Sequence, residues 1–116
     1  MKLTPKDCKQ KIIDNNWSKI LEYPFEENAL SIATSEIKWR YPNKWYAVNT
    51  NCDQVYLILK GDGVIEIADQ KEMIKLNEGD AFFIQKHTPY AIFGDYIKLV
   101  IANSPARDVT QYKLIE

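Results

Sequence analysis

Short runs of alternating apolar and polar residues, separated by turn-forming residues, cover most of the chain after residue 16. Val64 and Glu66 alternate with Ile65 and Ile67, which is the pattern of a half-buried strand. Many such short runs in succession are typical of an all-β sandwich or barrel. The strands that we predict cover residues 17–23, 29–40, 45–49, 55–59, 64–68, 73–76, 81–84, 90–93 and 97–102.

The glycines support these strand boundaries. All four of them, Gly61, Gly63, Gly79 and Gly94, fall between predicted strands. Glycine is favoured in turns because it adopts positive φ angles without steric cost. We therefore expect each glycine to lie in a turn and none to interrupt a strand.

The first residues carry the signals of a short helix. Thr4 suits the N-cap, Pro5 suits the first helical position, and Asp7 follows the cap by three residues. The residues spaced to share one apolar face are Cys8, Ile12 and Ile13. We expect the helix to end at the asparagines of positions 15–16 and to need packing against the barrel, because so short a helix is marginal alone.

Composition and charge exclude several classes of function. The 116 residues contain 15 basic and 16 acidic side chains, and the only arginines are Arg40 and Arg107, so we expect no nucleic-acid or membrane partner. No apolar run approaches the ~18 residues of a membrane span, and the first residues lack the apolar region of a signal peptide. The two cysteines, Cys8 and Cys52, make no disulfide framework, so we expect free thiols and a cytoplasmic location.

Two longer segments, residues 54–67 and 76–92, contain tight turns at defined places. Residues 60–63 (Lys-Gly-Asp-Gly) form one turn and residues 78–80 (Glu-Gly-Asp) another, while Pro89 requires an extended approach to Tyr90. Together the segments resemble the two motifs of the cupin superfamily, G-x5-H-x-H-x3/4-E-x6-G and G-x5-P-x-G-x2-H-x3-N. The resemblance covers about residues 40–103, and the segment between the motifs is short, as in small bacterial single-domain cupins.

This resemblance implies a double-stranded β-helix, the jelly-roll or cupin barrel, preceded by a short N-terminal helix. We expect one domain over residues 1–116. Within it, residues 1–16 form the helix and an arm, about 17–103 form the barrel, and 104–116 form an ordered C-terminal tail.

The chain departs from the motifs where cupins bind their metal. The usual ligand positions hold neutral residues: Ala47 with Asn49, or Val48 with Thr50, for the first two histidines, Gln54 for the glutamate, and Tyr90 for the last histidine. Such side chains do not form a competent site for a divalent transition metal. We therefore expect no metal and no cofactor, and not the metal-dependent chemistry of cupins.

His87 is the only histidine in the chain, and it falls on the glycine of the second motif. Histidine is among the non-glycine residues enriched at positive φ, so we expect a partly exposed turn residue at the mouth of the barrel. The alternative is a functional role at the cavity rim. In an enzyme, His87 would act as the general base and Tyr90 as the acid.

The resemblance implies that Asn49, Gln54 and Tyr90 point into the barrel. Strand alternation places Tyr56 on the face of Gln54, and Ile92 on that of Tyr90. Aromatic walls with neutral polar groups suit a small organic ligand, sugar-like or carboxylate. The alternative is that Gln54 and Tyr90 bond to each other and fill the cavity. The aromatic cluster of residues 39–46 offers Trp45 as a platform for the ligand at the barrel rim. The alternative is that this cluster packs in the core or forms a dimer contact.

Three functional hypotheses follow. We prefer a metal-free cupin that binds a small organic molecule without chemistry, as a sensor or carrier. The second is a metal-independent isomerase or epimerase that acts on a sugar derivative. The third is a dimeric interaction module with a filled barrel. A homodimer is expected in each case, because cupins commonly pair sheet edges and so cover them.

Overall fold

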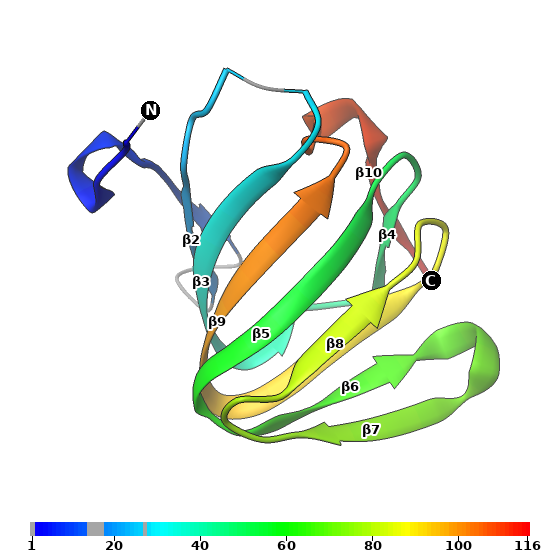
Figure 1. The fold of residues 1–116 in the computed structure, drawn as a ribbon. Coiled ribbons are helices and arrows are strands. Elements are labelled where there is room, and N and C mark those ends of the chain that lie inside the picture. Colours follow the sequence, from blue (N-terminus) through cyan, green and yellow to red (C-terminus); the bar gives the residue numbers. More distant parts are fainter. Residues whose placement is uncertain (1, 14–17, 27) are drawn as a thin grey trace.

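The computed structural model describes residues 2–13, 18–26 and 28–116, and it is an all-β barrel (Figure 1). Three short 3-10 turns accompany the strands: η1 Pro5–Asp7, η2 Ala68–Gln70 and η3 Val109–Gln111. The strands are β1 Lys9–Ile13, β2 Ser18–Glu22, β3 Ser31–Tyr41, β4 Tyr46–Asn49, β5 Asp53–Gly61, β6 Gly63–Ile67, β7 Glu72–Leu76, β8 Ala81–Ile84, β9 Tyr90–Ser104 and β10 Tyr112–Ile115. The predicted fold class is confirmed.

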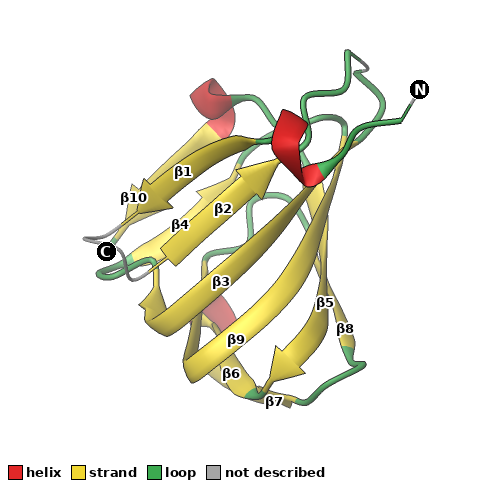
Figure 2. Ribbon diagram, turned by 90° about the vertical axis from the view of Figure 1, so that its left-hand side faces the viewer, coloured by secondary structure: helices red, strands yellow, loops and turns green. Residues whose placement is uncertain are grey.

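The long strand β9 belongs to both walls of the barrel. Its second half lies between β3 and β5, in a wall ordered β1-β2-β3-β9-β5-β8. Its first half pairs with β6 and, through Tyr90, with β4, in a wall that continues to β7 on one side and β10 on the other. Figure 2 shows β3, β9, β5 and β8 side by side as one curved sheet. All the pairs are antiparallel, as in a jelly roll.

Gly94 lies inside β9, so the expectation that no glycine interrupts a strand is wrong. The two predicted strands of residues 90–93 and 97–102 are one strand that turns from one wall to the other. A Cβ atom at Gly94 would lie 2.7 Å from Ile97 Cδ1 and 2.8 Å from the Asp62 carbonyl oxygen. The glycine therefore lets the bend pack directly against the β5–β6 turn.

The predicted N-terminal helix is only a 3-10 turn. The capping contacts form, since the Thr4 backbone N–H donates to Asp7 Oδ2 at 2.7 Å, but the helix stops after Asp7. Residues 9–13 instead form β1, which pairs with β2 along its whole length. The edge of β2 offers backbone partners to every residue of β1, and this outweighs a weak helical preference. The predicted helix end at residues 15–16 lies outside the described residues.

The segment after the predicted barrel adds a further strand. In β10, Tyr112 pairs with Asn49 and Ile115 with Tyr46 of β4. This pairing brings η3 and the residues before it against the end of the barrel where β4 ends and β5 begins. None of the helical turns in the described part of the chain has the length or the apolar character to cross a membrane.

The barrel interior has two chemically different ends. One end is filled with aliphatic side chains that have almost no exposed surface: Ile37, Ile58, Ile65, Ile92, Ile97 and Leu99. At the other end, buried amide and phenol side chains surround a cavity. The outer face of the β9-β5-β8 wall is also apolar, with Val55, Leu57, Leu59 and Phe83 exposed.

Candidate binding site

A cavity of about 300 Å³ opens at the polar end of the barrel. Asn49, Gln54, Tyr56 and Tyr90 form its floor, from β4, β5 and β9. Its mouth is bordered by residues 23–25 after β2 and by Arg107. A volume of this size is at the lower end of those that hold small organic ligands.

Buried amide side chains form one continuous chain of hydrogen bonds beneath the cavity. Gln111 Nε2 donates to Asn49 Oδ1, and Asn49 Nδ2 donates to Gln54 Oε1, both at 2.7 Å. Gln54 Nε2 then donates to Asn103 Oδ1 at 2.7 Å, and Asn103 Nδ2 to Ser31 Oγ at 3.2 Å. The sheet brings these groups together because Gln54 lies opposite Asn103 in the β5–β9 register. A buried amide without such a partner would cost about 1–3 kcal/mol.

One pair of phenols extends this network, and a second pair lines the cavity beside it. Tyr90 Oη donates to Gln54 Oε1 at 3.1 Å, so its single hydrogen is used, and Tyr56 Oη donates to Tyr90 Oη at 2.5 Å. The rings of Tyr56 and Tyr90 meet edge to face, with centroids 5.7 Å apart. Tyr41 Oη donates to Tyr112 Oη at 2.9 Å.

Burial governs how these phenols ionise. It raises the pKa values of Tyr41, Tyr56 and Tyr90 well above the usual value of 10.0. All three phenols are therefore protonated at neutral pH and keep a hydroxyl hydrogen to donate.

The donor set at the usual cupin metal position does not fit a metal ion. Asn49, Gln54 and Tyr90 are neutral, and their polar atoms already bond to one another. Transition metals bind imidazole, thiolate and carboxylate ligands in preference to neutral amides. Among the described residues, no group of three or more His, Cys, Asp or Glu side chains is placed to hold a metal.

The cysteines are free, as the sequence indicates. The thiol of Cys52 is 1% exposed and lies 3.6 Å from Gln111 Oε1 and 3.9 Å from Asn103 Oδ1. Burial raises the pKa of this thiol. Cys52 is therefore a packed member of the amide network, with little thiolate character.

Four of the predicted site residues meet in the cavity, and three lie elsewhere. Asn49, Gln54, Tyr56 and Tyr90 line it together. Ile92 is fully buried in the aliphatic core. Trp45 is 40% exposed outside the lining, with Lys44 Nζ 4.5 Å from the centre of its ring.

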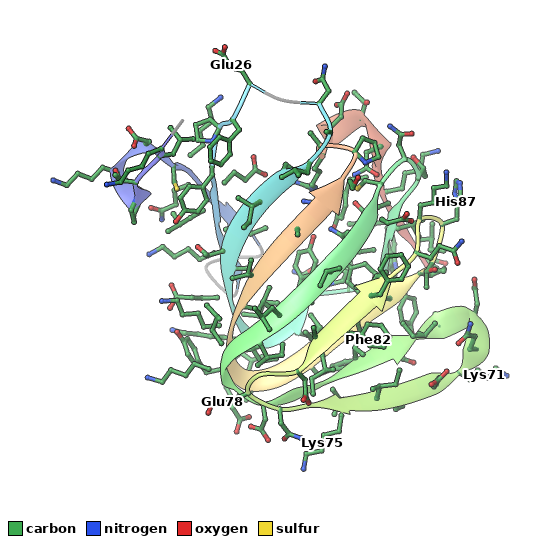
Figure 3. All side chains as sticks on the ribbon, viewed as in Figure 1. Glu26, Lys71, Lys75, Glu78, Phe82 and His87 are labelled. Atoms are coloured by element: carbon green, nitrogen blue, oxygen red, sulfur yellow. The ribbon has the colours of Figure 1, made fainter. Side chains whose placement is uncertain are left out.

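His87 occupies the turn that the motif predicts. Its φ angle is +70°, its side chain is exposed, and its backbone N–H donates to the Asn49 carbonyl at 2.7 Å. Figure 3 shows the side chain on the loop before β9, projecting away from the barrel. The structure therefore does not bring the His87 imidazole and the Tyr90 hydroxyl into one cavity.

Several residues of the site were missed in the sequence. Asn103 could have been found, because it continues the inward-facing series of β9, which runs Ile97, Leu99, Ile101, Asn103. Gln111, Tyr112 and Arg107 had no local signal, since they lie beyond the motifs in the predicted tail.

No family model matches the chain, and no curated protein matches it. Among solved structures, Streptomyces PAC13 with uridine superposes with a TM-score of 0.87 at 14% identity, over 100% of this chain and 90% of that one. KdgF from Halomonas sp. superposes with a TM-score of 0.71 at 16% identity, over 88% of this chain and 90% of that one. The Fe(II) form of HppE gives 0.75 at 13% identity, over 89% of this chain and 59% of that one. These likenesses show a cupin-like barrel fold.

Proposed function

We propose that this protein is a metal-free cupin-like barrel that binds a small hydroxyl-rich ring compound, of the sugar or nucleoside class, as a sensor or carrier. The observation that carries the proposal is the cavity floor, where amides and phenols are arranged in one hydrogen-bonded network. Such groups donate and accept without charge, which suits ligand hydroxyl and amide groups.

The tyrosine pair favours a nucleoside among these ligands. PAC13, described as a nucleoside dehydratase, has been solved with uridine in two variants that each replace one tyrosine by phenylalanine. Those two tyrosines are 34 residues apart, the same separation as Tyr56 and Tyr90. We infer that Tyr56 and Tyr90 contact the ring or sugar of a ligand here.

Binding is favoured over catalysis because no histidine lines the cavity, and the one carboxylate among its described residues is paired. PAC13 was also solved as a variant of a histidine that precedes both of its tyrosines, whereas the only histidine here, His87, follows Tyr56. Among the described residues of the lining, Glu22 is the only carboxylate, and it is paired with Arg107. A metal-independent isomerase or epimerase would have Tyr90 as its acid, but the chain's one histidine, His87, lies outside the cavity and cannot serve as its base.

The interaction-module alternative requires a filled barrel, and the cavity of about 300 Å³ argues against that. The expected homodimer is compatible with ligand binding. We place it on the exposed apolar outer face of β5 and β8, away from the cavity.

Titration calorimetry with uridine, other nucleosides and free monosaccharides tests the proposal. We expect saturable binding of at least one compound, lost in Gln54→Ala and kept in Gln85→Ala, because Gln85 is exposed outside the cavity. Absence of binding across the panel would overturn the proposal. So would conversion of the recovered ligand, seen by NMR, or a near-stoichiometric transition metal in elemental analysis.

A further inference from the structure

Arg107 is the only arginine that lines the cavity. Its side chain is 19% exposed, and its guanidinium lies 5.2 Å from the centre of the Tyr112 ring. Its backbone N–H donates to Ser31 Oγ at 3.0 Å. The stacking on Tyr112 and the backbone hydrogen bond to Ser31 therefore hold Arg107 at the mouth of the cavity.

To the described residues, the guanidinium makes one side-chain hydrogen bond, from Nη1 to Glu22 Oε1 at 3.0 Å. A guanidinium carries five N–H donors in a planar fork that matches two oxygens of a carboxylate or phosphate. Glu22 is 30% exposed at the end of β2, so water can solvate it if it separates from Arg107. The pair is therefore an exchangeable contact at the edge of the cavity.

The floor has no place for a negative charge. Gln54 Oε1 already accepts from Asn49 Nδ2 and Tyr90 Oη, and no cation lies among the floor residues. The charge of Arg107 nevertheless reaches this region: burial raises the pKa values of Tyr41, Tyr56 and Tyr90, and Arg107 opposes the rise. A ligand that lies on the floor would thus be neutral at its inner end and within reach of a cation at its outer end.

We propose that the ligand of this cavity carries an oxyanion, a carboxylate or a phosphate, at the end that faces the mouth, and that Arg107 binds it by exchanging Glu22 for the ligand. This inference rests on the proposed function and narrows its ligand to an anionic sugar or nucleoside derivative. Glu22 holds the guanidinium in place until the ligand arrives, and it competes with the ligand oxyanion.

Two matched series of probes test this inference by calorimetry: uridine, uridine 5′-carboxylate and uridine 5′-monophosphate, and glucose, glucuronate and glucose 6-phosphate. We expect an anionic member to bind about tenfold more tightly than its neutral parent. The charged hydrogen bonds between Arg107 and the ligand oxyanion contribute more binding free energy than the displacement of Glu22 costs. The better anion in each series distinguishes carboxylate from phosphate. The preference should shrink at high ionic strength.

The variants separate the role of Arg107 from a merely structural one. Arg107→Gln should abolish the preference for the anion, and Glu22→Gln should strengthen anion binding by removing the competitor. Arg40→Gln is the matched control. Arg40 is the other arginine, and it packs against Tyr46 and Phe93 and donates to the Pro42 carbonyl, outside the cavity. If Arg107→Gln does not fold, as judged by circular dichroism, Arg107→Lys replaces it and should retain only part of the preference.

Equal affinity for anionic and neutral members in the unmodified protein would overturn this inference and leave the proposed function intact. A preference for the anion that persists in the Arg107→Gln variant would also overturn this inference and leave the proposed function intact. Failure of every probe to bind would overturn both.

Discussion

The two ends of the barrel interior are buried to nearly the same degree but need different things from their surroundings. Ile58 and Leu99 at the aliphatic end are 1% and 0% exposed, and Asn49 and Gln54 at the cavity end are 3% and 4% exposed. The aliphatic side chains need only close packing, whereas each amide needs a partner for its donors and its acceptor. The comparison teaches that burial alone does not locate the site. The site lies where polar groups are buried together.

The aliphatic end should give the largest loss of stability. Leu99→Ala removes a fully buried side chain, so we expect the free energy of unfolding to fall by about 2–5 kcal/mol. Urea denaturation measures it. Leu30→Ala, at a position 57% exposed, is the control and should change stability by less than about 1 kcal/mol. A similar loss in both variants would mean that the aliphatic end is not the principal source of stability.

The cavity end should give the next largest loss. Gln54→Leu keeps the buried volume close to constant but removes the partner of Asn49 Nδ2, Asn103 Oδ1 and Tyr90 Oη. We expect about 2–3 kcal/mol of destabilisation in urea, since buried polar groups are left unpaired. Gln85→Leu, at an exposed position, should leave stability within about 0.5 kcal/mol of the parent. An unchanged midpoint for Gln54→Leu would show that the network is dispensable for folding.

Alkaline pH should weaken the cavity end selectively. The folded-state pKa values of Tyr41, Tyr56 and Tyr90 are raised above 10.0 by burial, so folding favours the protonated phenols. Their contribution is complete below pH 10 and is lost above it, by up to about 1.4 kcal/mol per pH unit for each phenol.

Urea denaturation between pH 8 and 11 checks this dependence. Tyr90→Phe should make the fall in stability shallower, because one buried phenol no longer ionises on unfolding. Stability that stays constant from pH 10 to 11 would contradict the assignment.

The smallest effect on folding is expected on the outer wall, where we place the homodimer. Leu57 and Val55 of β5 and Phe83 of β8 share this face, and Val55 lies opposite Phe83 in the register. Leu57→Lys should shift the mass in light scattering from dimer to monomer while the secondary structure stays unchanged. Met73→Lys, at an exposed position on β7 in the other wall, should remain dimeric. A monomeric parent protein, or a dimeric Leu57→Lys, would refute the placement.

Local pattern in the sequence was sufficient for most strands and for part of the floor. Residues 81–84 form a strand as predicted, and alternation correctly put Tyr56 on the same face of β5 as Gln54, which the resemblance to cupins had placed inward. The prediction of an N-terminal helix was wrong because residues 9–13 pair as a strand with the edge of β2. No local signal in the sequence reveals that this edge is available. Gly94 was misjudged because a bend that joins two walls resembles a turn in sequence.

The rest of the site depends on contacts between distant parts of the chain. Gln54 meets Asn103 across 49 residues, and Asn49 meets Gln111 across 62 residues. No motif spacing encodes such pairs, since they follow from strand register and from the return of the C-terminal segment to β4. Arg107 was visible only as one of two arginines, and its position at the mouth required the fold.

A single backbone N–H group fixes the direction of the hydrogen bonds in the amide network. The N–H of Asn51 donates to Gln111 Oε1 at 3.2 Å, and a peptide N–H cannot become an acceptor. This fixes which end of the Gln111 amide faces Asn49, and the same constraint passes through Gln54 to Tyr90 and Tyr56. No member can flip alone without placing two donors or two acceptors face to face. The cavity floor therefore presents an incoming molecule with one predetermined array of donors and acceptors, set before any ligand arrives.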